Sequence, residues 1–135
     1  MSCRVGPTGF HVDLLARTHA LAADEPKASG GTDSGPTPYE MLLMALGGCT
    51  AMTLRIYADR KGWPLEGATV SVRQSRSHEP DCERCTTEAV GVERIQRKIE
   101  LAGPLTEEQR ARLMSVADRC PVMQTFGRHI TVETI

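Results

Sequence analysis

The sequence predicts an α+β fold in which antiparallel strands pack against helices, because strand-like and helix-like segments follow one another in separate blocks. Apolar and polar side chains alternate in segments 10–16, 68–76 and 90–101, which is typical of half-buried strands. Residues 37–61 form a long apolar segment, and 106–118 has the apolar periodicity of an amphipathic helix. These observations together predict antiparallel sheet packed against a long buried helix.

The composition is that of an ordinary globular protein. The 135 residues, which we expect to form a single domain over 1–135, include 16 basic and 17 acidic residues. A net charge this close to zero gives no argument for a nucleic-acid or membrane-surface partner. The first residues lack the features of a signal peptide, and the apolar run 41–54 is shorter than the about 20 residues that a spanning helix needs. We therefore expect a cytoplasmic protein that binds neither nucleic acid nor membrane.

The first structured segment is predicted to be a β-hairpin. The alternating residues 10–16 are followed by Arg17 and Thr18, which can form a tight turn, and 19–23 can return as the second strand. The next segment, 24–38, is rich in proline and glycine and is predicted to be a loop.

A long helix is predicted to begin directly after Thr37. Thr37 supplies a capping hydroxyl, Pro38 suits the first helical position, and Glu40 completes the capping-box pattern. Gly62, followed closely by Pro64, is a typical helix stop.

This helix is apolar on all sides, since no charged residue appears between Glu40 and Arg55. Such a helix must be buried, and one sheet covers only one side of it. The chain has few residues left for a second layer, so we expect a homodimer with an extensive apolar interface. Gly47 and Gly48 each cost about 1 kcal/mol relative to alanine. Close approach of another helix, access of a ligand to Cys49, or both would explain them.

The second half of the chain is predicted to contain an antiparallel strand pair and two helical segments. Segment 68–76 pairs with 90–101, whose less regular alternation allows a bulge. Thr106 caps the helix that follows. Behind it the sequence predicts a short helical turn at 122–126 and a last strand at 129–134.

The chain contains five cysteines, an odd number that argues against a structural disulfide framework. The alternatives to such a framework are buried, metal-bound or redox-active thiols. Cys49 lies in the middle of the apolar helix, and Cys120 lies between a helix and Pro121. The two thiols can be small core residues, or they can meet and form a reversible disulfide.

Two segments resemble the OsmC/Ohr family of thiol-dependent peroxidases. They are GPTPYEMLLMALGGCTAMTL, a proline-led helix with a small-small-Cys centre, and ADRCPVMQTF, a helix that ends in Cys-Pro. The resemblance covers nearly the whole chain. It implies an OsmC-like α+β fold and an intertwined homodimer, with sheets wrapped around a pair of long central helices.

The resemblance also implies a chemistry. Cys49 matches the peroxidatic cysteine, whose thiolate attacks an organic hydroperoxide and becomes a sulfenic acid. Cys120 matches the resolving cysteine, which closes a Cys49–Cys120 disulfide. A dithiol, of the lipoyl type in part of the family, would reduce it, and no cofactor is implied.

Two more catalytic residues are implied by the resemblance. Arg17 is the candidate for the family's N-terminal arginine, and the alternative is an exposed turn residue. Tyr39 holds the position of the family's glutamate, so that Glu40 either replaces it or serves only as the capping carboxylate. Met123 stands where many relatives carry histidine.

The remaining cysteines give weaker signals. Cys82 and Cys85 form one CxxC, with His78 nearby, which is half of a zinc site at most. We expect no metal, and an incidental surface pair is the simpler interpretation. The alternative to a peroxidase is a non-catalytic dimer that binds a small apolar ligand or senses redox state.

Overall fold

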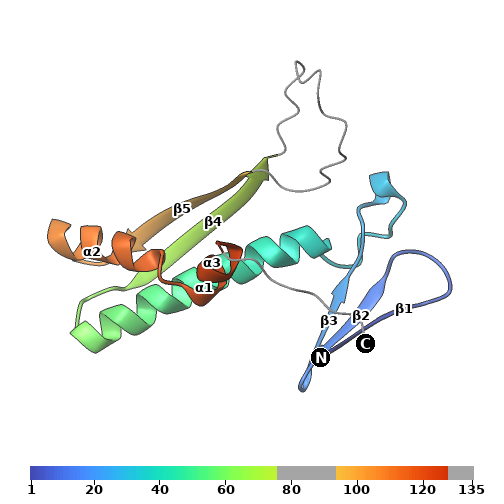
Figure 1. Ribbon diagram of the computed structural model, residues 1–135, viewed down its shortest axis with the longest axis horizontal. Helices are drawn as coiled ribbons and strands as arrows, with labels where there is room; N and C mark the ends of the chain where they lie inside the picture. The colour runs from blue at the N-terminus through green and yellow to red at the C-terminus, as the bar shows by residue number, and fades with distance from the viewer. Residues whose placement is uncertain (76–93, 128–135) are drawn as a thin grey trace, which may run out of the picture. The chain divides into compact units, whose positions relative to one another are not determined.

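The computed structural model describes residues 1–75 and 94–127, in two compact units, Met1–Leu42 and Leu43–Ile135. Figure 1 shows the elements of each unit. The predicted last strand at 129–134 and the loop that holds His78, Cys82 and Cys85 lie outside the described residues.

The first unit contains a three-stranded antiparallel sheet in the order β1-β2-β3. The predicted hairpin is confirmed as β2 (Val12–Ala16) and β3 (His19–Ala23), and Arg17 lies in its two-residue turn with a φ of 58°. Strand β1 (Ser2–Val5), which pairs with β2, was not predicted from the sequence. All four of its side chains are exposed, so it has no apolar alternation to reveal it.

Asp24 organises the loop that follows β3. Its buried carboxylate accepts hydrogen bonds from the Thr32 N–H (3.0 Å) and hydroxyl (2.5 Å), from the Ser34 N–H (3.2 Å) and hydroxyl (2.9 Å), and from the Glu25 N–H (2.8 Å). The Thr32 hydroxyl is the main cause that holds the pKa of Asp24 well below its usual range, although burial opposes it. A short 3₁₀ turn (Lys27–Ser29) lies in the same loop.

The predicted long helix is α1 (Pro38–Lys61), and its capping box is present. The Thr37 N–H donates to Glu40 Oε2 at 2.8 Å, and the Glu40 N–H donates to the Thr37 hydroxyl at 3.2 Å. Gly62 follows the last turn with a φ of 65°, a left-handed conformation that suits glycine.

The second unit pairs β4 (Gly67–Ser75) with β5 (Arg94–Ala102) in one antiparallel ladder. The register runs without interruption over both strands, so the bulge that the sequence allowed is absent from the described part of the pair. Side chains of β5 alternate strictly between half-buried and exposed.

Two further helices belong to the described part of this unit. The predicted amphipathic helix is α2 (Glu107–Ala117), capped reciprocally by Thr106 and Gln109, and the short helical turn is α3 (Pro121–Phe126). Helix α1 contributes Leu54 and Ala58 to a buried core whose other members are Leu65, Leu105, Leu113 and Ala117.

Helix α1 has a buried and an exposed face, both largely apolar. The buried stripe repeats every four residues and consists of Leu46, Thr50, Leu54 and Ala58. The exposed stripe lies two residues away, on the opposite side, and consists of Met44, Gly48, Met52 and Ile56. Among residues 1–75 and 94–127, the helix is therefore covered on one side only, and the second layer that the sequence predicted stays a prediction.

The glycines of α1 have different surroundings. A Cβ on Gly47 would lie 3.3 Å from Val72 Cγ2 and 3.6 Å from the Val70 carbonyl oxygen, whereas a Cβ on Gly48 would meet nothing within 4 Å. Gly47 therefore allows close approach of β4. The prediction that Gly47 allows close approach of another helix is wrong within the described chain.

By length and composition, α1 is the one helix of the described residues that could cross a membrane. The apolar run 41–54 is only the central part of this helix, which spans 24 residues. The same length and composition occur in core helices, and the packing of Leu54 and Ala58 against α2 is of that kind.

Leu113 tests the core of the second unit. Leu113→Ala is expected to lower the free energy of unfolding by about 2–5 kcal/mol, because the leucine is fully buried. The neighbouring Met114 is 44% exposed, so Met114→Ala should cost less than about 1 kcal/mol. Equal losses in denaturant unfolding would contradict the packing described.

Asp24 tests the loop of the first unit. Its pKa is lowered by folding, so the ionised carboxylate stabilises the fold above the unfolded value of about 3.9, and this contribution is lost as pH falls toward the folded pKa. Asp24→Asn is therefore expected to lower the melting temperature at pH 7, with a smaller difference from the parent in strong acid. Asp33→Asn is the matched control, since Asp33 is exposed. Identical melting curves for the two variants would refute the role of Asp24.

Candidate functional site

The structure places the thiols of Cys49 and Cys120 within hydrogen-bonding reach of each other. Cys49 lies in the middle of α1 and is half-buried, whereas Cys120 is fully buried at the N-cap of α3. Hydrogen bonding between the two side chains is among the causes that shift the pKa of each thiol. Both are free thiols, so the structure represents the reduced pair.

Cys120 lies between the end of α2 and the start of α3, where its surroundings favour the ionised form of the thiol. Burial raises the pKa of its thiol, but hydrogen bonds from Cys49, from the Met123 N–H, from the Thr50 side chain and from the Val122 N–H outweigh burial and lower it. The Met123 N–H lies 3.5 Å from Cys120 Sγ. The turn that starts α3 therefore directs two backbone donors at this sulfur.

Cys49 is shifted the other way. Burial raises the pKa of the Cys49 thiol, and hydrogen bonding with Cys120 raises it further, while the Val122 N–H lowers it. The two thiols therefore ionise in two steps that belong to the pair.

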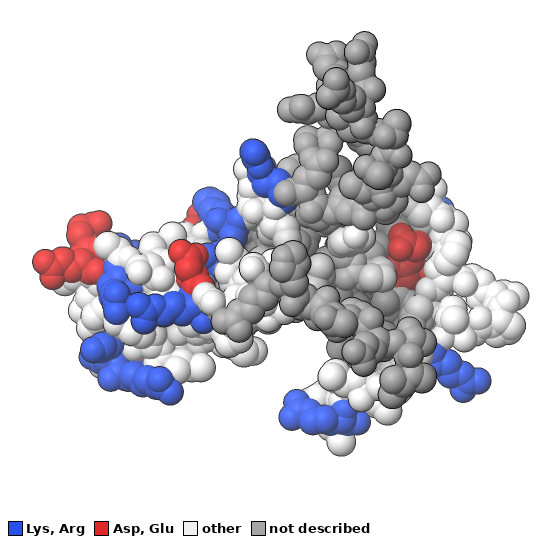
Figure 2. Space-filling view, viewed as in Figure 1, with Lys and Arg blue, Asp and Glu red and all other residues white. Residues whose placement is uncertain are grey.

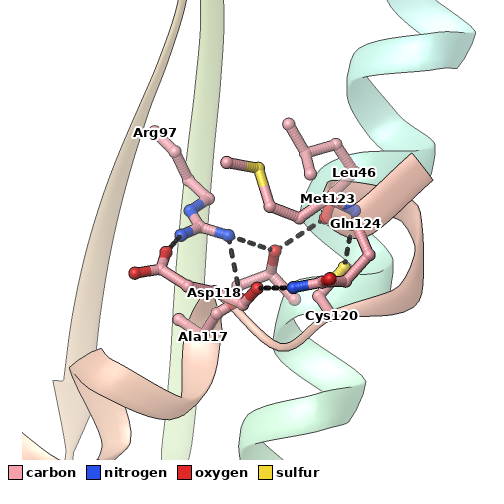
Figure 3. Close-up of polar contacts among 8 residues, drawn as sticks. Leu46, Arg97, Ala117, Asp118, Cys120, Met123 and Gln124 are labelled. Carbon is pink, nitrogen blue, oxygen red and sulfur yellow. Dashed lines mark hydrogen bonds and ion pairs between the residues drawn. The ribbon is translucent and has the colours of Figure 1, made fainter. Parts of the chain in front are cut away.

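Arg97 of β5 is a cation that binds the Thr50 side chain next to Cys49, and it was not predicted from the sequence. Its Nη1 donates to the Thr50 hydroxyl oxygen at 3.0 Å and to the Ala117 carbonyl at 3.1 Å, and its Nη2 lies 2.6 Å from Asp118 Oδ1. Figure 3 shows the Arg97 side chain pointing from β5 toward Ala117 and Asp118, with Cys120 further along the same corner. The side chain is only 13% exposed.

A signal for Arg97 was present in the sequence. Ile95, Ile99 and Leu101 occupy the inward positions of β5, and Arg97 takes the place between them where another apolar residue would be expected. A lone arginine on the inward face of a strand indicates a buried polar partner.

The other predicted site residues belong to the first unit. Glu40 is bound in the capping box of α1, as one of its two interpretations predicted. Arg17 is an exposed residue of the β2–β3 turn. A role for either residue beside the thiols stays a prediction.

No group of three or more His, Cys, Asp or Glu side chains suited to a metal ion occurs in 1–75 and 94–127. On the face drawn in Figure 2, basic and acidic side chains lie interspersed around α2 and the end of α1. The neighbours that shift the pKa values of the thiol pair are the other thiol of the pair, the side chains of Thr50 and Thr53, and the N–H groups at the start of α3.

Comparison with known proteins places this site in a family. The model of the OsmC-like protein family matches residues 31–135, which include both thiols. A search of curated proteins found no match.

Solved structures share the fold at low sequence identity. An OsmC-like protein from Mycoplasma pneumoniae has a TM-score of 0.72 and 24% identity, over 87% of this chain and 79% of its own. An organic hydroperoxide resistance protein OsmC from Legionella pneumophila has a TM-score of 0.66 and 18% identity, over 93% of this chain and 85% of its own. An organic hydroperoxide resistance protein from Elizabethkingia anophelis has a TM-score of 0.66 and 17% identity, over 92% of this chain and 84% of its own. With the family model covering most of the sequence, the chain belongs to the OsmC-like protein family.

Proposed function

We propose that the protein is a cysteine-based peroxidase that reduces organic hydroperoxides in defence against oxidative stress. The observation that carries this proposal is the contact between the Cys49 and Cys120 thiols, which lets one sulfur take up oxygen and the other displace it. The names of the Legionella and Elizabethkingia relatives, both hydroperoxide resistance proteins, support the same chemistry.

In the proposed cycle, the Cys49 thiolate attacks the distal oxygen of the hydroperoxide. The O–O bond breaks, the alcohol leaves after protonation, and Cys49 becomes a sulfenic acid. The Cys120 thiolate then attacks the Cys49 sulfur, a disulfide forms, and hydroxide leaves. Cys49 takes the first role because it is half-buried, whereas Cys120 is fully buried and out of reach of a substrate.

The surroundings of Cys49 favour an apolar substrate. Its neighbours one turn away on α1 are Ala45, Leu46 and Met52, and Met52 is 68% exposed. An alkyl or aryl hydroperoxide could rest its apolar part on this surface. Gly48, with no atom near its missing Cβ, leaves room beside the thiol.

The disulfide would be reduced by a dithiol, of the lipoyl type in our proposal. Because Cys120 is fully buried, the attacking thiolate would reach the Cys49 sulfur and release Cys120 as the leaving thiolate. The lowered pKa of Cys120 makes it a good leaving group. We place this cycle in the cytoplasm, where thiols are kept reduced.

We further propose that a second copy of the chain covers the exposed stripe of α1. Met44, Met52 and Ile56 are each more than half exposed, and Gly48 between them would permit close helix contact. Two such stripes facing each other would bury apolar surface without leaving a charge unpaired. Arg17, with Glu40 at the start of α1, is proposed to complete the site in that homodimer.

Cysteine variants test the cycle. Cys49→Ser is expected to reduce hydroperoxide-dependent oxidation of a dithiol to the uncatalysed rate. Cys120→Ser should still consume about one equivalent of hydroperoxide per chain, because only the resolving step is lost. Cys3→Ser is the matched control, since Cys3 lies exposed in β1, and it should keep full turnover. Unchanged turnover in Cys49→Ser would reject the proposal.

The oligomeric state tests the exposed stripe. Met52→Glu is expected to convert a dimer into monomers in sedimentation experiments at micromolar concentration, because it would bury a carboxylate in an apolar contact. Arg60→Glu, on the exposed polar end of the same helix, should leave the dimer intact. A monomeric parent chain, or a Met52→Glu dimer as tight as the parent, would contradict this interface.

A further inference from the structure

We propose that the hollow between the end of α1 and the start of α2 is a binding site for a small organic anion with a flat aromatic body, such as an aromatic carboxylate. The hollow has a volume of about 650 Å³, and its lining includes Tyr57, Lys61, Trp63 and Arg112. Tyr57 lies two turns of α1 beyond Cys49, or about 12 Å along the helix axis, so the hollow is separate from the thiol pair. The inference therefore goes beyond the proposed peroxidase function.

Two aromatic rings form one wall of the hollow. The rings of Tyr57 and Trp63 meet edge to face, with centroids 5.5 Å apart and an angle of 71° between their planes. Both side chains are half-buried and pack against the core around Leu54 and Leu113, which holds the rings in place. Two rings at this angle form an apolar corner, and a flat group can pack against it with offset or edge-to-face contacts.

Two basic side chains lie at the same corner. Lys61 Nζ lies 5.9 Å and Arg112 Cζ 5.7 Å from the centroid of the Tyr57 ring. Arg112 Nε donates to the Tyr57 hydroxyl oxygen at 3.0 Å, which ties α2 to α1 at this end of the helix pair. This hydrogen bond is the main cause that lowers the pKa of Tyr57. Loss of hydration opposes it, and the charges of Arg112 and Lys61 lower the pKa further.

The hydrogen-bond donors of these basic groups are only partly used. Within 1–75 and 94–127, neither Lys61 nor Arg112 forms an ion pair, and the two terminal nitrogens of Arg112 have no acceptor. Thr106 and Gln109, which also line the hollow, use their side-chain acceptors in the capping box of α2. A guanidinium with two unused terminal nitrogens can bind a carboxylate through two parallel hydrogen bonds, and an ammonium group beside it adds a further donor. The hollow therefore favours an anion.

Glu108 opposes this preference. Among the described residues that line the hollow, it is the only acidic one, and it lies exposed in the first turn of α2. Its carboxylate would repel a bound anion, but the two cations leave an excess of positive charge. Removal of the Glu108 charge is therefore expected to strengthen the binding of an anion.

The experiment uses Trp63 as the reporter. It is the only tryptophan of the chain, so its fluorescence follows the hollow directly. The full chain is titrated with benzoate at constant ionic strength, and we expect a saturable change in the emission of Trp63 at millimolar benzoate. Benzamide has the same ring without the charge. It should bind about tenfold more weakly, because the charge-assisted hydrogen bonds are lost.

Variants locate the binding site. Arg112→Met is expected to weaken benzoate binding about tenfold, and Lys61→Met should cause a smaller loss in the same direction. Arg60→Met is the matched control, because it removes an exposed cation of α1 that does not line the hollow, and it should bind benzoate as the parent does. Glu108→Gln should bind more tightly than the parent. If circular dichroism shows that Arg112→Met does not fold, Lys61→Met supplies the test, as it leaves the hydrogen bond to Tyr57 in place.

The outcomes that would overturn the proposal are distinct. No saturable change with benzoate, equal binding of benzoate and benzamide, or a loss in Arg60→Met as large as in Arg112→Met would each reject the anion site. Inorganic phosphate that competes as well as benzoate would reject the role of the two rings. Cys49→Ser should bind benzoate like the parent even though hydroperoxide turnover is lost, so this proposal and the proposed function fail separately. Weaker benzoate binding in Cys49→Ser would place the anion at the thiol pair and contradict the hollow as its site.

Discussion

The larger unit depends on a stripe of α1 residues spaced four apart. Leu46, Thr50, Leu54 and Ala58 are buried together, and Gly47 beside them lets β4 approach where a larger residue would collide. This packing fixes the rotation of the helix. Cys49 then emerges at the edge of the buried face, where it is half-covered and next to the only buried polar side chain of the stripe, Thr50.

The same packing sets the electrostatics of the site. A thiolate that is fully buried loses its hydration, and this must be offset by donors of the protein. The turn at the start of α3 supplies the Met123 and Val122 N–H groups, and Thr50 supplies a hydroxyl. Arg97 is fixed between Thr50, Ala117 and Asp118, so a strand, the central helix and the end of α2 meet at one guanidinium.

The local signals in the sequence predicted much of the fold. The hairpin around Arg17, the capping box of Thr37 and Glu40, and the pairing of β4 with β5 follow from short-range patterns of side chains and turns. Strand β1 gave no such signal, because it is an exposed edge strand held by backbone pairing with β2. The sequence correctly predicted close approach of another element at Gly47. It could not identify that element as β4, because this depends on tertiary packing.

The site was predictable only in part. Cys49 and Cys120 stand out in sequence because each lies in a distinctive segment, but their contact requires the corner between α2 and α3. The role of Arg97 depends on three partners distant in sequence, Thr50, Ala117 and Asp118, which no local pattern brings together. The sequence signal for this network was an arginine at an inward position of β5, where the neighbouring inward residues are apolar.

The central claim is that Cys49 and Cys120 act as one redox pair, and the direct measurement is the location of the disulfide. The reduced protein would be treated with one equivalent of an organic hydroperoxide, alkylated, digested without reduction and examined by mass spectrometry. The account predicts an intramolecular Cys49–Cys120 link as the main product. A disulfide between Cys82 and Cys85, or oxidation of Cys49 to sulfinic acid with Cys120 still a free thiol, would contradict it.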